Sequence, residues 1–260
     1  MLNLTFTQLD ALMAQFFWPF VRIGACFMAA PVFGAKFVPP RMRILLALAV
    51  TMIVTPLVPT SEPTSPLSLA GMLITIQQVI IGLAIGFALQ LVFDALSMGG
   101  QLLSNSMGLS FAFNVDPLRG ASTPVLGQLY MLLVTLTFLA LNGHLILIEL
   151  LVDGFETLPV GPQGLSNEMT WALLEWGEQL FVGSLAVALP GMTALLVVNL
   201  AFGVMSRAAP TLNLFAVGFP ITLVFGLAIV FAGLPSVQAS FVQSMGAAMD
   251  VVRLVLGMQP

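Results

Sequence analysis

The feature that most constrains this chain is a series of long apolar stretches that contain almost no charged residues. Of its 260 residues, 59% are hydrophobic and only 7% are charged, whereas soluble domains carry about 25% charged residues. A helix that crosses a bilayer needs about 20 apolar residues. Stretches that approach or exceed this length cover 11–33, 43–58, 69–93, 125–151, 179–205 and 212–234. The sequence therefore predicts an all-α, polytopic helical membrane protein.

Proline and glycine interrupt several of these stretches. The interruptions include Pro19, Pro190, Gly191, Gly218 and Pro220. A proline inside a helix removes a hydrogen bond and costs about 3 kcal/mol, so we expect Pro/Gly-broken helices of the kind found in pores and transporters. A seventh apolar stretch, 237–256, contains Asp250 and Arg253. It is predicted to lie at the membrane interface or to be shielded by protein.

The composition argues against several classes of function. Cys26 and His144 are the only residues of their types, which leaves no internal disulfide and no Cys/His metal site of the usual kind. A net charge of -4 without a basic stripe does not fit a nucleic-acid partner. No serine and histidine stand at a catalytic spacing, and no phosphate-binding glycine loop follows a strand. We therefore expect no enzymatic activity, no cofactor and no metal.

Basic residues occur in alternate connectors between the apolar stretches. They are Lys36, Arg41, Arg43, Arg119 and Arg207, while the connectors 59–68 and 152–170 carry only acidic charges. Cytoplasmic loops carry the excess of Lys and Arg. This alternation predicts that the N-terminus lies outside the cytoplasm.

The segment 104–120, SNSMGLSFAFNVDPLRG, fits neither a membrane helix nor an ordinary soluble loop. Glycine, serine and asparagine alternate with Phe111 and Phe113, and the only ionisable groups are Asp116 and Arg119. Irregular backbone at a bilayer is tolerated where it is buried in protein or lines a wet cavity. The composition therefore predicts a loop that lines or closes a pore. Met107 is the methionine of this segment whose flexible side chain suits a deformable seal.

Two further features lie within the apolar stretches. A cation such as Arg22 costs roughly 2.5–3.5 kcal/mol at the bilayer centre, so we expect it to be buried. Two environments are possible for the Arg22 side chain. It either forms an ion pair, with Asp94, Glu149 or Asp250 as candidate partners, or snorkels to the membrane interface.

Gly82 and Gly86 form a GxxxG pattern, which predicts close helix packing within or between chains. His144 is interpreted either as a proton relay or as a neutral histidine that makes an interhelical hydrogen bond.

One run of residues carries a specific family signature. The sequence R-x-x-P-x-x-N-x-F-x-x-G-F-P is met by Arg207, Pro210, Asn213, Phe215, Gly218 and Pro220. In this respect the chain resembles the FliR family, the R-type export-gate subunits of flagellar type III secretion systems. The segments 39–43, 142–144 and 108–117 also look like landmarks of that family, and the resemblance covers essentially the whole chain.

The resemblance implies a fold, partners and a location. It implies a helical part shaped like the P-type subunit over 1–170 and a helical hairpin shaped like the Q-type subunit over 171–260. The implied partners are the P-type and Q-type subunits (FliP and FliQ), FlhB and FlhA, membrane lipid, and unfolded flagellar proteins as cargo. The implied location is the flagellar basal body in the bacterial inner membrane.

In this family a loop of the R-type subunit plugs the gate. The matching positions are Met107, Gly108, Leu109, Ser110, Phe111, Ala112, Phe113, Asn114, Val115, Asp116 and Pro117. The alternative function is a secondary transporter or small-solute channel that acts alone, which predicts an internal inverted repeat and a polar site at mid-membrane. No such repeat is visible, and Arg22 and His144 are the polar residues that a site of this kind would use.

Overall fold

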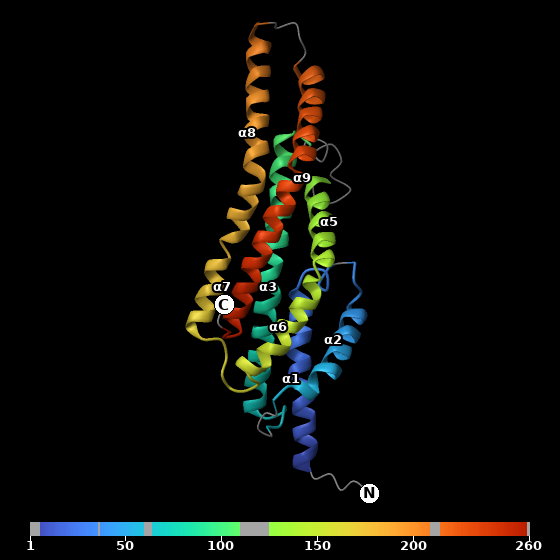
Figure 1. The fold of residues 1–260 in the computed structure, drawn as a ribbon, viewed down its shortest axis with the longest axis vertical. Coiled ribbons are helices and arrows are strands. Elements are labelled where there is room, and N and C mark those ends of the chain that lie inside the picture. The colour runs from blue at the N-terminus through green and yellow to red at the C-terminus, as the bar shows by residue number, and fades with distance from the viewer. Residues whose placement is uncertain (1–5, 36, 60–63, 110–124, 209–213, 259–260) are drawn as a thin grey trace. The chain divides into compact units, whose positions relative to one another are not determined.

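All regular elements in the described part of the chain are helices (Figure 1). A computed structural model describes residues 6–35, 37–59, 64–109, 125–208 and 214–258. Its elements are α1 (Phe6–Ala29), α2 (Pro40–Val54), η1 (Thr55–Leu57), α3 (Leu69–Ser106), α5 (Val125–Ala140), α6 (Gly143–Thr157), α7 (Asn167–Trp176), α8 (Gln179–Ala208) and α9 (Leu214–Val255). No strand occurs among these residues, and the predicted all-α membrane class is confirmed.

The membrane-spanning helices differ in part from those predicted. By length and composition four helical segments of the described residues can cross a membrane, or five if α5 and α6 form one bent span. The sequence suggested six. The described apolar part of α1, Met13–Ala29, is shorter than a span. The stretches 212–234 and 237–256 are not separate, because α9 continues from one into the other.

Prolines do not end the helices that contain them. Pro19 lies inside α1, Pro190 inside α8, and Pro220 and Pro235 inside α9. An interior proline frees one backbone carbonyl, which neighbouring groups in a membrane protein can satisfy. The helices therefore carry local interruptions of the hydrogen-bond ladder and continue beyond them.

The stretch 125–151 was expected to be one helix but is two. The axes of α5 and α6 differ by 63°. Asn142 adopts a left-handed conformation with φ 56°, which asparagine tolerates better than most residues. Gly143 follows, and a Cβ there would overlap the Phe138 ring. The Asn-Gly pair therefore ends one helix and begins the next.

The helices form two compact units. The first contains 1–91, 138–177 and 246–260. In it α2 packs on α1 (Figure 1). Trp18 is fully buried in a cluster with Ala14 and Ile74, and its indole Nε1 donates a hydrogen bond to Thr75 Oγ1 at 3.2 Å. These contacts hold α1 against the first half of α3.

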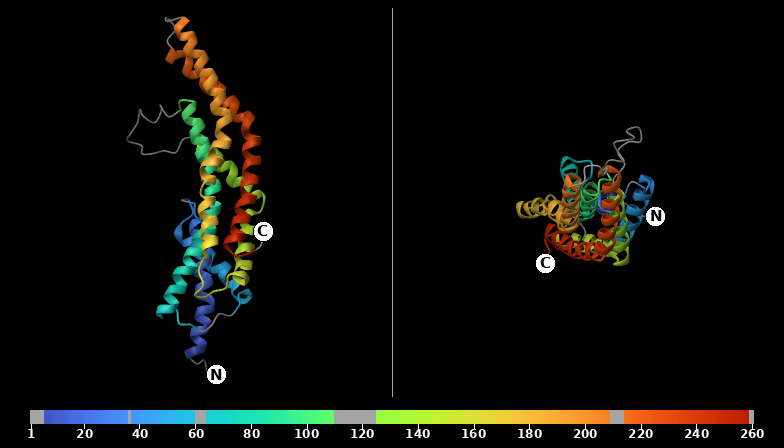
Figure 2. Two further views of the ribbon diagram at one scale, coloured as in Figure 1. Left: turned by 90° about the vertical axis from the view of Figure 1, so that its left-hand side faces the viewer. Right: turned by 90° about the horizontal axis from the view of Figure 1, so that it is seen from above.

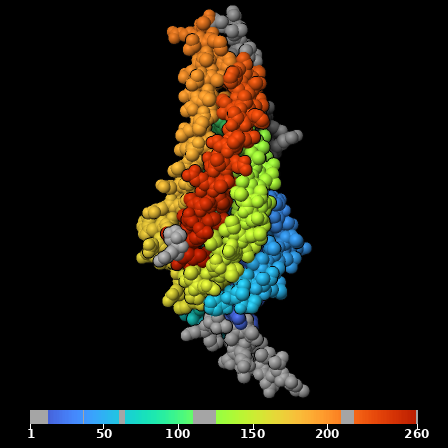
Figure 3. Space-filling model, in the orientation of Figure 1, coloured from blue at the N-terminus to red at the C-terminus, as the bar shows by residue number. Residues whose placement is uncertain are grey.

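The second unit contains 92–137 and 178–245. Here the second half of α3 packs against α8 and α9. The helices α8 and α9 lie side by side in Figure 1 and in the rotated view of Figure 2. The rings of Phe93 and Phe241 meet edge to face at 5.4 Å. Figure 3 shows α9 forming much of one face of this unit. Its exposed apolar side chains include Val224, Phe225, Leu227 and Phe231.

Candidate functional site

The first unit is built around a fully buried arginine. Arg22 is 0% exposed. Its Nε donates to Gln78 Oε1 of α3 at 2.6 Å, its Nη1 to the Gly154 carbonyl of α6 at 3.1 Å, and its Nη2 to the Leu158 carbonyl at 2.8 Å. The Cζ atom also lies 4.3 Å from the ring centroid of Phe155. One side chain thus joins α1, α3 and the end of α6.

The acceptors of Arg22 explain how a buried cation is stabilised here. Gly154 and Leu158 stand at the C-terminal end of α6, where the helix dipole is negative. The Gly154 carbonyl accepts both from Arg22 Nη1 and from the Leu158 N–H. The aromatic face of Phe155 adds a cation–π contact. All of the acceptors are uncharged. The predicted carboxylate partner is therefore wrong, and carbonyl groups at the end of a helix take its place. The snorkelling alternative is wrong, because the side chain is fully buried.

Two glycines of α3 allow α1 to approach closely enough for this arrangement. A Cβ at Gly82 would overlap the Arg22 carbonyl oxygen and lie 2.9 Å from Ala25 Cβ. A Cβ at Gly86 would lie 2.7 Å from both Ala30 N and Cys26 O. The GxxxG pattern therefore lies at a helix contact within this chain.

The same end of α6 also receives the C-terminal end of α9. Thr157 Oγ1 donates to the Leu256 carbonyl at 2.6 Å, and a Cβ at Gly154 would come 2.6 Å from Leu256 Cδ2. Gly154 therefore contacts Arg22 through its carbonyl and Leu256 at the position that a side chain would occupy.

The sequence anticipated none of the four partners of Arg22, which are Gln78, the carbonyls of Gly154 and Leu158, and the ring of Phe155. The signal for Gln78 was available, because two adjacent glutamines, Gln77 and Gln78, interrupt the apolar stretch 69–93. Gly154 had no comparable signal, because its role depends on its carbonyl and on the lack of a side chain.

In the second unit, α3 ends at the residues where the predicted plug begins. Gly108 is left-handed with φ 77°. Its N–H donates to the Asn105 carbonyl at 3.0 Å, and the Leu109 N–H donates to the Ser104 carbonyl at 3.1 Å. This pair of bonds is a Schellman motif, which requires a left-handed residue and favours glycine. Met107 is buried, and Leu109 is half-buried.

The other predicted residues are distributed as follows. Arg207 is exposed in the last turn of α8, where a cation complements the helix dipole. In α9, Gly218 is buried and Pro220 is exposed. Residues 110–117, Pro210, Asn213 and the side chain of Phe215 lie outside the described part of the structure.

His144 lies at the start of α6, and its Nδ1 is buried. In the described part of the chain this nitrogen has no hydrogen-bond partner. Among the described residues, the interhelical hydrogen bond considered for His144 is therefore not made through Nδ1.

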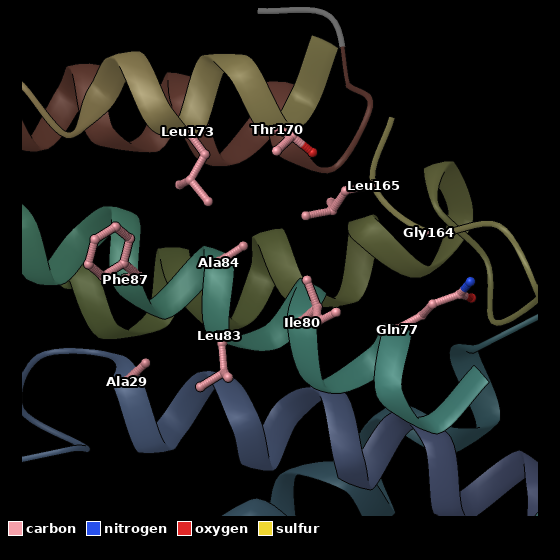
Figure 4. A pocket seen from close by; sticks show the side chains of 10 residues that line it. All are labelled: Ala29, Gln77, Ile80, Leu83, Ala84, Phe87, Gly164, Leu165, Thr170 and Leu173. Atoms are coloured by element: carbon pink, nitrogen blue, oxygen red, sulfur yellow. The ribbon is translucent and has the colours of Figure 1, made fainter. Parts of the chain in front are cut away.

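An apolar groove of about 720 Å³ lies in the first unit (Figure 4). Ile80, Ala84 and Phe87 of α3 face Leu165 and Leu173 across it. Two hydrogen bonds fix its walls: Gln77 Nε2 to the Pro162 carbonyl at 2.7 Å, and Trp176 Nε1 to the Ala88 carbonyl at 2.8 Å. None of the described residues that line the groove is charged, so it suits an apolar group. Within the described ranges, no cluster of His, Cys, Asp or Glu is arranged to hold a metal ion.

The fold and the buried cation define a polytopic helical membrane protein whose polar interactions tie helices to one another. The model of the family "Bacterial export proteins, family 1" matches residues 13–248. The chain belongs to this family.

Curated relatives match over most of their own length. The chain is 39% identical over 235 residues to the flagellar biosynthetic protein FliR of Escherichia coli strain K12, covering 90% of each chain. It is 41% identical over 227 residues to FliR of Pectobacterium carotovorum, covering 86% of each. The similarity extends to FliR of Bacillus subtilis at 27% over 215 residues, covering 82% of this chain and 83% of the relative.

Proposed function

We propose that this chain is a core subunit of the flagellar type III export gate, which forms part of the conduit through which unfolded flagellar proteins cross the inner membrane. The observation that carries the proposal is the similarity to FliR proteins over about nine-tenths of both chains. In this proposal the chain works in the basal body with the P-type and Q-type subunits, FliP and FliQ, and with FlhB and FlhA. It has no enzymatic role, and the driving force for export comes from its partners.

The distribution of buried surface supports an assembled subunit. In the most apolar window of α3, 67% of the residues are buried inside the chain, but only 28% are buried in the window of α7–α8 and 22% in that of α9. Apolar helix faces that find no cover within the chain are satisfied by lipid or by other apolar subunits. We propose that α8 and α9, within the Q-type-like part 171–260, present such faces to neighbouring subunits, and that 1–170 is the P-type-like part.

Within the gate, we propose that residues 107–117 close the conduit. Phe111 and Phe113 would fill a narrow lumen, because hydrophobic constrictions block ions by excluding water. The Schellman glycine, Gly108, supports this proposal because it ends α3 at the start of the segment. Deleting 107–117 is expected to raise ion leakage through the assembled gate. Unchanged leakage would remove the plug assignment.

Native mass spectrometry tests the subunit role itself. The tagged chain is co-expressed with its P-type and Q-type partners and extracted in mild detergent. We expect a hetero-oligomer of fixed stoichiometry. A monomer or homodimer that excludes both partners would contradict the export-gate proposal and favour a transporter that acts alone.

A further inference from the structure

The last two turns of α3 fit into two glycine sites on other helices of the second unit. Leu103 and Met107 are four residues apart and so share one face of α3. They are 3% and 1% exposed. Leu103 packs on Gly191 of α8, and Met107 packs on Gly226 of α9.

Both glycines supply space that an alanine would remove. A Cβ at Gly226 would lie 2.5 Å from Met107 Cε, 2.6 Å from its Cγ and 2.8 Å from its Sδ. A Cβ at Gly191 would lie 2.7 Å from Leu103 Cδ1. Glycine weakens a helix interior, so its presence here has a packing reason. The end of α3 is therefore positioned against α8 and α9 by complementary side-chain packing.

Two features of this contact would allow its release. It is made by apolar packing, and the flexible thioether of Met107 can adopt other rotamers at low cost. In the same turn the Ser104 hydroxyl is buried without a hydrogen-bond partner in the described part of the chain. An unpaired buried hydroxyl destabilises the packed state. Release of this turn would let that hydroxyl find a partner.

We propose that the contact between Met107 and Gly226 is a latch, which fixes the end of α3 against α9 in the resting gate and opens while cargo passes. The inference rests on the proposed export function. It concerns the coupling between two helices, and it assigns Met107 and Gly226 as positioning residues.

A reversible disulfide tests the latch directly. Met107→Cys and Gly226→Cys are combined in the full chain, in cells that carry the complete export apparatus. Adding the Cβ–Cγ bond of about 1.5 Å to the 2.6 Å separation places the two Cβ atoms at most about 4.1 Å apart. A disulfide spans roughly 3.5–4.5 Å between Cβ atoms. The only native cysteine, Cys26, is fully buried.

The matched control joins α3 to α8 away from the latch. Ala95→Cys with Gly183→Cys places two Cβ atoms 3.2 Å apart in the same unit, and a shift of a few tenths of an ångström brings them to the separation of a disulfide. After treatment with copper phenanthroline, we expect the latch pair to reduce flagellin secretion at least tenfold and dithiothreitol to restore it. The control pair should secrete alike in both states. Equal secretion by the oxidised and reduced latch pair, with the disulfide verified, would overturn the proposal.

A second variant covers the case in which the double cysteine chain does not accumulate. Gly226→Ala displaces Met107, and we expect it to raise ion leakage through the assembled gate severalfold. Gly233→Ala in the same helix is the control, because a Cβ there meets no atom within 4 Å. Equal leakage from the two variants would contradict the latch. A strain that lacks this chain yet still secretes flagellin would instead contradict the export function itself.

Discussion

Replacing Arg22 by methionine tests the account of the buried cation. Methionine keeps much of the volume but has no donors. The Gly154 carbonyl retains its bond from the Leu158 N–H at 3.0 Å. Gln78 Oε1 and the Leu158 carbonyl lose the bonds from Arg22 at 2.6 Å and 2.8 Å and keep none among the described residues. Arg22→Met therefore leaves two acceptors that are buried without a donor.

The magnitude follows from these two acceptors. A buried acceptor without a partner costs about 1–3 kcal/mol, so the pair costs about 2–6 kcal/mol. We expect Arg22→Met to lower the free energy of unfolding by roughly 3 kcal/mol. The measurement is an SDS titration of the purified full chain in mild detergent, followed by far-UV circular dichroism.

Two further variants make this prediction specific. Arg253→Met removes an exposed arginine whose Nη1 lies 2.8 Å from Asp250 Oδ1, and we expect a loss of only about 0.2–1 kcal/mol. Arg22→Met combined with Gln78→Leu removes donor and acceptor together. This pair should cost less than the sum of the single changes, with a coupling of about 0.5–3 kcal/mol. Equal losses for Arg22→Met and Arg253→Met, or strict additivity in the double variant, would refute the reasoning.

Three glycine substitutions provide further predictions. Gly82→Ala should destabilise the chain by about 1–3 kcal/mol through overpacking against α1, whereas Gly24→Ala, whose Cβ meets nothing within 4 Å, should be neutral or stabilising in the same SDS titration. Gly154→Ala should cost about 1–3 kcal/mol because its Cβ would meet Leu256, and thermal unfolding of the detergent-solubilised chain that matches wild type would contradict this. Gly108→Ala should cost roughly 1–2 kcal/mol for a left-handed φ and reduce the yield of folded chain on size-exclusion chromatography. Gly108→Asn should lose less, since asparagine tolerates that conformation.

Local patterns were enough to predict the class of fold, because backbone in a membrane must satisfy its own hydrogen bonds and long apolar stretches therefore become helices. The end of α3 could also be anticipated, since Gly108 follows a helical pattern where a left-handed residue is favoured. The separation of α5 from α6 was missed although Asn142-Gly143 stood in the sequence. The apolar residues on both sides of this pair favoured one continuous helix, and the two-residue turn signal was given too little weight.

The amino-acid sequence was sufficient to predict an all-helical membrane protein, a buried Arg22 that needs partners, and a close helix contact at Gly82 and Gly86. The identity of the partners of Arg22, the carbonyls at the end of α6 and the amide of Gln78, became visible only in the three-dimensional packing of the helices. Backbone carbonyls exist at every residue and carry no pattern in the sequence. Which of them face a cation depends on where a helix ends and on which helices pack together. The same holds for Gly154 and Gly226, whose role is the space they leave for a side chain distant in the sequence.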